Sequence, residues 1–447
     1  MGTGFDSIAE QVLGMAKTKG SLQAEVFLLD SQELTIEVAE KRLENLKLAQ
    51  ERGLGLRIVD NRRLGYAFTA DLSPGSLEKV VDSALHNAQM VEQDPFWELP
   101  RPCDTYPELV TFDEKTFDAP IENKMELARQ METAARSYDK RVTITEKAVY
   151  QDSKYRVLIY NNRGVQVNYR GSYCGGYIVV VGQENGDSQT GFGMQFELFY
   201  HNLDPAKIGQ EAGRKAIRML GAQRIPSGVM PVVLDPHSVT SFMGVLQFAF
   251  SAEAVLKGKS FLQGLEGQTV ASPLLTLVDD GTLDGGLGSS PFDGEGNPTS
   301  ETMLLQNGKL SGFLHNGYTA KKMGACSTGN GVRNSYKMLP EVGTTNLYIK
   351  KGDLDPQEIL QDIERGLLIT DVMGIHTANP ISGDFSIGAS GILIENGRLT
   401  SPVKGVAVAG NLRNFLQDID AVGNDLTFFA GKGAPTLRLK SLAVSGA

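Results

Sequence analysis

Histidine and cysteine are the residues most often found around a catalytic zinc ion, and in this chain both are few and scattered. A zinc peptidase helix needs two histidines on neighbouring turns and a glutamate that activates water. No histidine is followed by glutamate, no two share a helical turn, and the cysteines form no C-x-x-C pair. The residues concerned are His86, His201, His237, His315, His376, Cys103, Cys174 and Cys326. We therefore predict no metal ligand in this chain, although a site assembled from distant residues stays open.

The sequence also lacks the usual surroundings of a catalytic nucleophile. There is no G-x-S-x-G elbow, no S-x-x-K followed by its partners, and no cysteine with a convincing histidine context. Cys174 lies in a stretch of alternating polarity, so we predict a packed strand thiol. No catalytic residue is predicted.

Two glycine-rich segments resemble ligand loops without meeting their requirements. Gly258-Lys-Ser260 looks like the end of a phosphate-binding loop, but Glu253 stands where the earlier glycine is needed. Residues 293–298, Asp-Gly-Glu-Gly-Asn-Pro, resemble the start of a calcium loop but lack its later bidentate glutamate. We predict a solvated glycine turn at 293–298.

Length and composition indicate a globular protein of two or three domains. The chain has 447 residues, of which 41% are hydrophobic and 21% charged. Its net charge of −10 disfavours direct nucleic-acid binding, because a phosphate backbone would be repelled. Three distant cysteines favour a reducing compartment. Since no signal peptide and no bilayer-length apolar stretch are visible, we expect a cytoplasmic protein without a membrane partner.

The elements that would position any site divide into two halves. Residues 1–222 are predicted to form an α+β domain of N-terminal helices with an antiparallel sheet. A capping box, Ser7-Ile-Ala-Glu10, is expected to begin the first helix, and Asp204-Pro205 a later one. Strands are predicted at 24–30 and 34–39, a hairpin at 53–60 and 64–71, and a meander of about four strands over 142–200.

Residues 223–447 are predicted to form a C-terminal β-rich, barrel-like domain that is closed or partly closed. A strand at 229–234 precedes a helix at about 237–256 that is apolar almost all round and is therefore expected to be buried. Two Asn-Gly turns between apolar flanks, at 304–310 and 393–399, predict tight hairpins.

Several linked motifs in this second half resemble the TldD/PmbA family, whose members were named modulators of DNA gyrase. The matching stretches keep the family's order and spacing over roughly residues 229–440, and the first half has a similar layout. They are Tyr318-Thr-Ala-Lys-Lys-Met-Gly-Ala-Cys-Ser-Thr-Gly-Asn-Gly331, Asn379-Pro-Ile-Ser-Gly-Asp-Phe-Ser386, Gly388-Ala-Ser-Gly391 with Ile394-Glu-Asn-Gly397, and Val408-Ala-Gly-Asn-Leu412 with Ala421-Val-Gly-Asn-Asp425.

The resemblance implies the PmbA branch, also called TldE. In the TldD branch, an H-E-x-x-x-H helix and a later cysteine hold zinc. Here the corresponding helix, about 242–256, carries Phe, Ser and Ala where histidines are required, and residues 431–436 lack the cysteine. The resemblance therefore implies no cofactor in this chain and zinc only in a TldD-type partner. It further implies a dimer, with that sister chain or with itself, around a chamber for extended peptides.

The family motifs also supply candidate site residues, for which two interpretations stay open. Gly383-Asp-Phe-Ser386 shapes a tight connection, because glycine supplies a positive φ and aspartate caps amides, or it lines the peptide chamber. The same alternatives apply to Asn411, which follows Ala409-Gly410 at the end of an apolar strand. The candidates for chamber lining are Gly383, Asp384, Phe385, Ser386, Gly410 and Asn411.

Three functions follow as hypotheses. The first is a non-catalytic subunit of a two-component zinc metallopeptidase that matures or degrades unfolded or leader-bearing peptides. The second is a regulatory or scaffold protein that binds another protein, such as DNA gyrase or a toxin–antitoxin component, which the acidic charge would suit. The third is an independent peptidase of unfamiliar chemistry.

Overall fold

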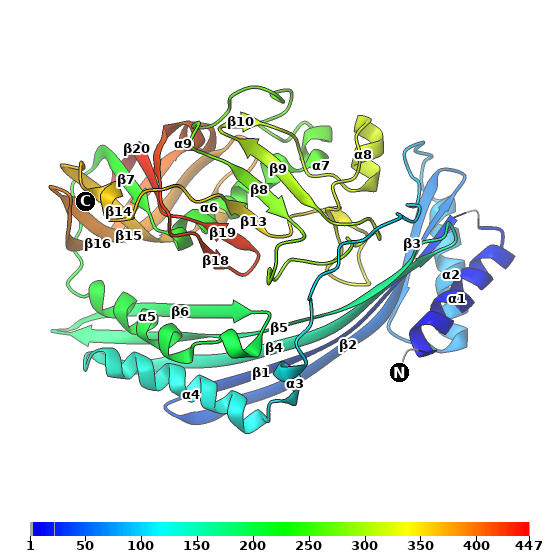
Figure 1. The fold of residues 1–447 in the computed structure, drawn as a ribbon, viewed down its shortest axis with the longest axis horizontal. Coiled ribbons are helices and arrows are strands. Elements are labelled where there is room, and N and C mark those ends of the chain that lie inside the picture. The colour runs from blue at the N-terminus through cyan, green and yellow to red at the C-terminus, as the bar shows by residue number, and fades with distance from the viewer. Residues whose placement is uncertain (1–2, 22, 447) are drawn as a thin grey trace.

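The first half of the chain is built around one curved antiparallel sheet. The computed structural model describes residues 3–21 and 23–446, and its first sheet has the strand order β3-β2-β1-β4-β5-β6. Helices α1 and α2 lie at one end of this sheet, and α4 and α5 at the other (Figure 1). The elements are α1 (Thr3–Thr18), β1 (Gln23–Ala39), β2 (Arg42–Asp60), β3 (Arg63–Thr69), α2 (Pro74–Gln89), α3 (Glu114–Asp118), α4 (Ile121–Tyr138), β4 (Val142–Asn161), β5 (Gln166–Glu184), β6 (Asp187–Glu197), a 3-10 turn (Tyr200–Asn202) and α5 (Pro205–Arg218).

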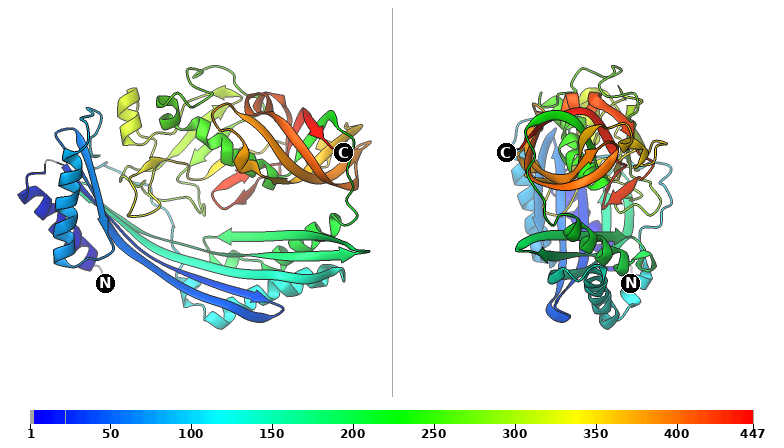
Figure 2. Two further views of the ribbon diagram at one scale, coloured as in Figure 1. Left: turned by 180° about the vertical axis from the view of Figure 1, so that it is seen from behind. Right: turned by 90° about the vertical axis from the view of Figure 1, so that its left-hand side faces the viewer.

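The middle of this sheet is buried on both faces. Because side chains alternate along a strand, Val26 and Leu28 pack against α1 and α2. Phe27 and Leu29 point to the other face, where they join Phe292 of the second half in a separate apolar cluster. The second half thus lies over the concave face of the sheet, as Figure 2 shows from behind.

The second half contains a closed barrel beside a smaller sheet. Strands β16, β15, β14, β7 and β20 follow one another, and β20 pairs back to β16, which closes the ring. The other sheet has the order β10-β9-β8-β13-β19-β18. The elements are β7 (Gly228–Leu234), α6 (Pro236–Leu246), α7 (Ala252–Leu256), β8 (Leu277–Asp280), β9 (Glu301–Gln306), β10 (Lys309–Leu310), α8 (Gly317–Met323), β11 (Gly331–Val332), β12 (Glu341–Val342), β13 (Leu347–Ile349), β14 (Arg365–Met373), β15 (Asp384–Glu395), β16 (Arg398–Asn411), α9 (Leu412–Asp418), β17 (Ile419–Val422), β18 (Thr427–Phe429), β19 (Lys432–Ala434) and β20 (Leu437–Ser445), with 3-10 turns at Gln247–Phe250, Glu358–Leu360 and Ile375–Thr377.

The architecture confirms the predicted α+β class and the barrel-like second half. Both Asn-Gly hairpins are also confirmed, because Gln306 pairs with Lys309 and Glu395 with Arg398. The apolar helix after β7 is buried as expected, with Phe242 inside the core.

Four local predictions were wrong, and the first two errors have a physical cause. The helix expected over 237–256 breaks at a 3-10 turn, because Ser251 is extended and the flanking backbone bonds to Leu314 on both sides. The strands expected at 24–30 and 34–39 are one strand, β1. The polar residues 31–33 between them continue the strand, because β2 and β4 pair with them along both edges. The first helix begins before Ser7, and the meander over 142–200 has three long strands.

The turn at 293–298 also differs from the prediction, because it is buried between the two halves. Asp293 accepts backbone N–H bonds from Glu295, Asn297 and Gly331. The Glu295 carboxylate accepts a hydrogen bond of 2.7 Å from Arg57 of β2. The segment therefore joins the second half to the sheet.

Candidate functional site

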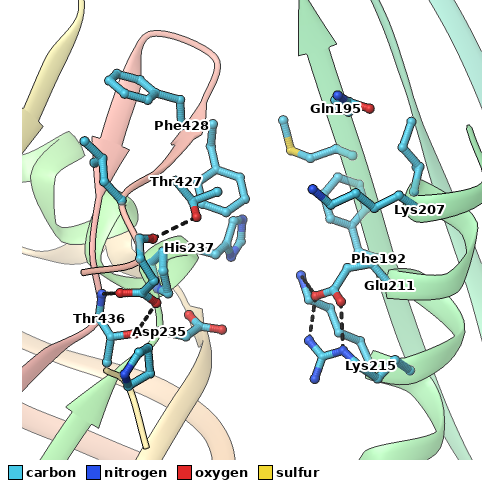
Figure 3. A pocket seen from close by; sticks show the side chains of 18 of the residues that line it. Phe192, Gln195, Lys207, Glu211, Lys215, Asp235, His237, Thr427, Phe428 and Thr436 are labelled. Carbon is cyan, nitrogen blue, oxygen red and sulfur yellow. Dashed lines mark hydrogen bonds and ion pairs between the residues drawn. The ribbon is translucent and has the colours of Figure 1, made fainter. Parts of the chain in front are cut away.

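A large cleft lies between the far end of the sheet and the second half. It has a volume of about 1070 Å³ and is formed by α5 and β6 on one side and by the starts of α6 and β18 on the other. Figure 3 shows Lys207, Glu211 and Lys215 on the α5 wall, facing His237 and Phe428 across the opening. This cleft is the principal candidate site because both halves contribute charged and aromatic side chains to it.

The α5 wall is an amphipathic helix, which its cap and its apolar face hold in place. Asp204 caps α5 by accepting a hydrogen bond of 3.0 Å from the N–H of Lys207. Ile208, Ala212 and Ala216 pack into the apolar cluster under the sheet. A Cβ at Gly209 would lie 2.1 Å from a backbone oxygen of α4, so glycine permits the close contact of the two helices.

The face of α5 that is not packed against the sheet lines the cleft and is mainly basic. Lys207, Arg214, Lys215 and Arg218 all contribute to the lining. Glu211 pairs with two of them, at 2.7 Å from Arg214 and 3.4 Å from Lys215. Burial, and then the charge of Arg214, lower the pKa of Arg218. The wall therefore carries more positive charge than its own carboxylate balances.

The opposite wall begins at the amino end of α6. Asp235 caps this helix, with its carboxylate accepting a bond of 2.8 Å from the N–H of Ser238. His237 lies in edge contact with Phe429, with ring centroids 5.1 Å apart. Burial and then the charge of Lys215 lower the pKa of His237, which favours a neutral imidazole at neutral pH.

Two strand edges border the cleft. Strand β6 is the last in the first sheet and β18 is the last in the small sheet, so each has a pairing strand on one side only within the described sheets. Residues of both strands, including Phe192, Phe196 and Phe428, line the cleft. Asp425 fixes the turn before β18 by accepting bonds from the N–H and hydroxyl of Thr436, at 2.8 and 2.7 Å.

The six candidate residues from the sequence lie elsewhere, at the paired ends of β15 and β16. Asn411 donates hydrogen bonds to Asp384, at 2.8 Å, and to the carbonyl of Ser382, at 3.0 Å, and it also caps α9. The bond from Asn411 and then that from Ser382 lower the pKa of Asp384. Gly383 has a φ of +84°, which glycine adopts readily.

The remaining candidates differ in their surroundings. Phe385 is buried, with its ring centroid 5.3 Å from that of Phe242, and a Cβ at Gly410 would lie 2.9 Å from the Phe385 ring. Ser386 is exposed. The structure thus brings Gly383, Asp384 and Asn411 together, and none of the six lines the cleft described above. Their role in a peptide chamber stays a prediction.

The residues present do not fit a zinc ion. A catalytic zinc site uses three protein ligands drawn from histidine, cysteine and carboxylate. Within residues 3–21 and 23–446 there is no group of three or more such side chains that could hold a metal ion. In the cleft, Asp235 is engaged in capping α6.

Sequence reasoning missed the cleft. The sequence does indicate the basic face of α5, because Lys207, Arg214, Lys215 and Arg218 recur at helical spacing behind Asp204-Pro205. What the sequence did not indicate is that this face lies opposite α6 and β18. Contacts between the halves are non-local, so no periodicity signals them.

Comparison with models of known protein families identifies the class of this protein, a family of metallopeptidases. Models described as the PmbA/TldA metallopeptidase domain 1, central domain and C-terminal domain match residues 24–88, 114–220 and 227–446. The chain belongs to the TldD/PmbA family. This confirms the resemblance found in the sequence.

Curated relatives and solved structures agree with this assignment. Metalloprotease PmbA of Escherichia coli O157:H7 is 28% identical, over 95% of this chain and 92% of the relative. A TldD metalloprotease homologue of Haemophilus influenzae is 28% identical over 89% of this chain and 87% of its own. A Thermotoga maritima protein described as a modulator of a DNA gyrase superposes with a TM-score of 0.92 at 28% identity, covering 99% of this chain and 100% of that one.

The fold is also that of TldE from Thermococcus kodakarensis, with a TM-score of 0.90 at 24% identity, covering 98% of this chain and 100% of that one. No helix in the described part of the chain is both long and apolar enough to cross a membrane.

Proposed function

We propose that this chain is the PmbA/TldE-type, non-catalytic subunit of a two-component zinc metallopeptidase that acts on unfolded or leader-bearing peptides in the cytoplasm. The zinc would be held by a TldD-type sister chain and would supply the activated water for hydrolysis. This chain's own residues bind and align the peptide. It pairs with the sister chain, with itself, or with both.

The side chains on the helix after β7 support the non-catalytic role. Residues 242–256 contain no H-E-x-x-x-H, and the helix is replaced at Gln247–Phe250 by a 3-10 turn. Phe242 and Phe250 are buried in the core there. Apolar side chains cannot replace nitrogen or sulfur ligands, so we derive no catalytic step from this chain.

The observation that carries the peptide-binding role is the cleft bordered by β6 and β18, each of which pairs with a strand on one side only within the described sheets. An extended peptide that pairs with such an edge is held through its backbone, which is indifferent to side-chain identity. Aromatic residues beside the edges would take apolar side chains of the peptide. This suits a substrate that is defined by being unfolded.

The test compares three preparations: this chain alone, a TldD-type chain alone, and the two mixed. Zinc content is measured by atomic absorption, and hydrolysis of an unfolded peptide by mass spectrometry. We expect zinc in the TldD-type chain and hydrolysis that depends on that chain. Stoichiometric zinc together with hydrolysis by this chain alone would overturn the proposal and favour an independent peptidase.

A scaffold role is the alternative, and the name of the Thermotoga maritima relative makes DNA gyrase its first candidate partner. A pull-down with the tagged full-length chain separates the two proposals. Recovery of a TldD-type chain supports the peptidase subunit, whereas recovery of gyrase or a toxin–antitoxin component without it supports the scaffold.

A further inference from the structure

A second space, the inner cavity, adjoins the cleft on the concave face of the first sheet. Its volume is about 600 Å³, within the range of roughly 300–1,000 Å³ that is typical of small-ligand sites. Leu287 lines both the cleft and the inner cavity. On the sheet side, Tyr173 of the inner cavity lies in edge contact with Phe196 of the cleft, with ring centroids 6.2 Å apart. The two spaces are therefore neighbours along both walls.

The floor of the inner cavity is aromatic, because tyrosines of neighbouring strands point to the same face. Val157 of β4 is directly opposite Tyr169 of β5, and Tyr155, two positions before Val157, shares its face. The rings of Tyr155 and Tyr169 are in edge contact, with centroids 6.0 Å apart. A Cβ at Gly171 would lie 2.2 Å from the Tyr155 ring, so glycine lets this ring lie across β5. Tyr155, Tyr169 and Tyr173 are only half-buried, so part of each ring is open to a ligand.

Three charged side chains also line the inner cavity, and each is engaged with other parts of the chain. Arg333 pairs with Glu25 at 2.8 Å, and Glu51 pairs with Lys337 at 3.2 Å. Asp293 accepts the three backbone N–H bonds of the buried turn. A charged ligand would lose its water shell without meeting an unengaged opposite charge among the described lining residues. The lining therefore suits an uncharged ligand.

We propose that the inner cavity is a subsite for an aromatic side chain, which belongs to a peptide held in the cleft. The inference rests on the proposed peptide-binding function and adds a preference to it. A peptide side chain is the expected occupant because the inner cavity adjoins the cleft at Leu287. An aromatic ring is uncharged and packs edge-to-face or offset on the tyrosines of the floor. Folded proteins bury most of their large apolar side chains, so this preference would favour unfolded substrates.

The experiment measures binding of labelled, unstructured peptides to the full-length chain by fluorescence anisotropy, with and without a TldD-type chain. The peptides share one sequence rich in glycine and serine and differ at a single central position, which is tryptophan, alanine, glutamate or lysine. We expect the tryptophan peptide to bind about tenfold or more tightly than the alanine peptide, the effect of burying one large apolar side chain. The glutamate and lysine peptides should bind no more tightly than the alanine peptide.

Variants and cross-linking then locate the subsite. Leu287→Trp places a large ring between the cleft and the inner cavity, so this variant should bind the tryptophan and alanine peptides about equally. Leu274→Trp is the matched control, because Leu274 is 52% exposed and lies outside both spaces, and it should retain the preference. A peptide with benzoylphenylalanine at the same position, irradiated with the wild-type chain, should label Tyr155, Tyr169 or Tyr173. This measurement decides the matter if Leu287→Trp does not fold.

The outcomes separate this inference from the function on which it rests. Equal binding of the tryptophan and alanine peptides by the wild-type chain, an unchanged preference in Leu287→Trp, or cross-links only to α5 or β18 overturns the aromatic subsite while peptide binding stands. A glutamate or lysine peptide that binds as tightly as the tryptophan peptide overturns it as well. If no peptide binds in either preparation, both proposals fail.

Discussion

Removing one charge from the buried ion network between the halves should destabilise the whole chain. Glu25 and Arg57 are opposite each other on β1 and β2, and their side chains meet at 2.7 Å. The second half contributes Glu295, at 2.7 Å from Arg57, and Arg333, at 2.8 Å from Glu25. Burial opposes the charge on Arg57, but the carboxylates of Glu25 and Glu295 outweigh it and raise the pKa of Arg57 above its usual value.

The perturbation is Glu25→Gln, which keeps the shape of the side chain. The Arg333 side chain is 0% exposed and has no other carboxylate within ion-pairing distance in the described chain, so the substitution leaves a buried, unpaired cation. Breaking such a pair costs about 3–5 kcal/mol. With an unfolding entropy of roughly 2 cal/mol/K per residue, a chain of 447 residues that melts as one unit should lose about 3–5 °C.

The assay is differential scanning calorimetry at pH 7, with Glu114→Gln as the matched control. Glu114 pairs with Arg170 at 3.0 Å, but the two side chains are 66% and 54% exposed, so its loss should cost less than about 1 kcal/mol. Adding Arg333→Met to Glu25→Gln should restore part of the stability, because the unpaired charge is then gone.

A melting temperature equal to that of the Glu114→Gln control would refute the reasoning. So would a double variant that is as unstable as the sum of its single variants.

Three further predictions use other features of the fold. Burial, and then the charge of Glu295, raise the pKa of Asp293 from 3.8 to about 7. Between these pH values the folded chain keeps a proton that the unfolded chain has lost, so the free energy of unfolding should decrease as the pH rises from about 4 to about 7. Melting curves of Asp293→Asn, measured over the same pH range, should lack that decrease. Gly191→Ala should lower the melting temperature, because its Cβ would lie 1.9 Å from a backbone oxygen of α5, whereas Gly14→Ala in α1 meets no atom within 4 Å and should raise stability by about 0.5–1 kcal/mol. Asn411→Ala should cost about 1 kcal/mol in urea unfolding, since it removes the cap of α9; an unchanged midpoint would contradict that role.

Local signals in the sequence predicted the elements whose cause is local. The Asn-Gly turns at 307 and 396 specify their hairpins because both residues of each turn adopt positive φ, which Asn and Gly tolerate. The burial of the apolar helix after β7 was also predicted from a local signal, because a helix that is apolar almost all round has no face suited to water.

Features with a non-local cause were missed. The helix break at Ser251 depends on backbone hydrogen bonds to Leu314, and no sequence signal near residue 251 predicts these bonds. The turn at 293–298 was expected in solvent because its residues are polar. Glu295 is instead buried, where its carboxylate accepts a hydrogen bond from Arg57, 238 positions earlier in the chain. The cleft belongs to this group too, since its walls come from α5 and from β18.

The same non-local contacts link the stability of the chain to its proposed work. The two strand edges that border the cleft belong to different sheets, β6 to the first half and β18 to the second. The distance between these edges is therefore set by whatever joins the halves, and the ion network of Glu25, Arg57, Glu295 and Arg333 is a buried part of that junction. A peptide that pairs with either edge gains from a fixed opposite wall, because aligned walls reduce the entropy lost on binding. In the proposed two-component peptidase, this chain would in this way contribute a rigid cleft that holds the substrate extended.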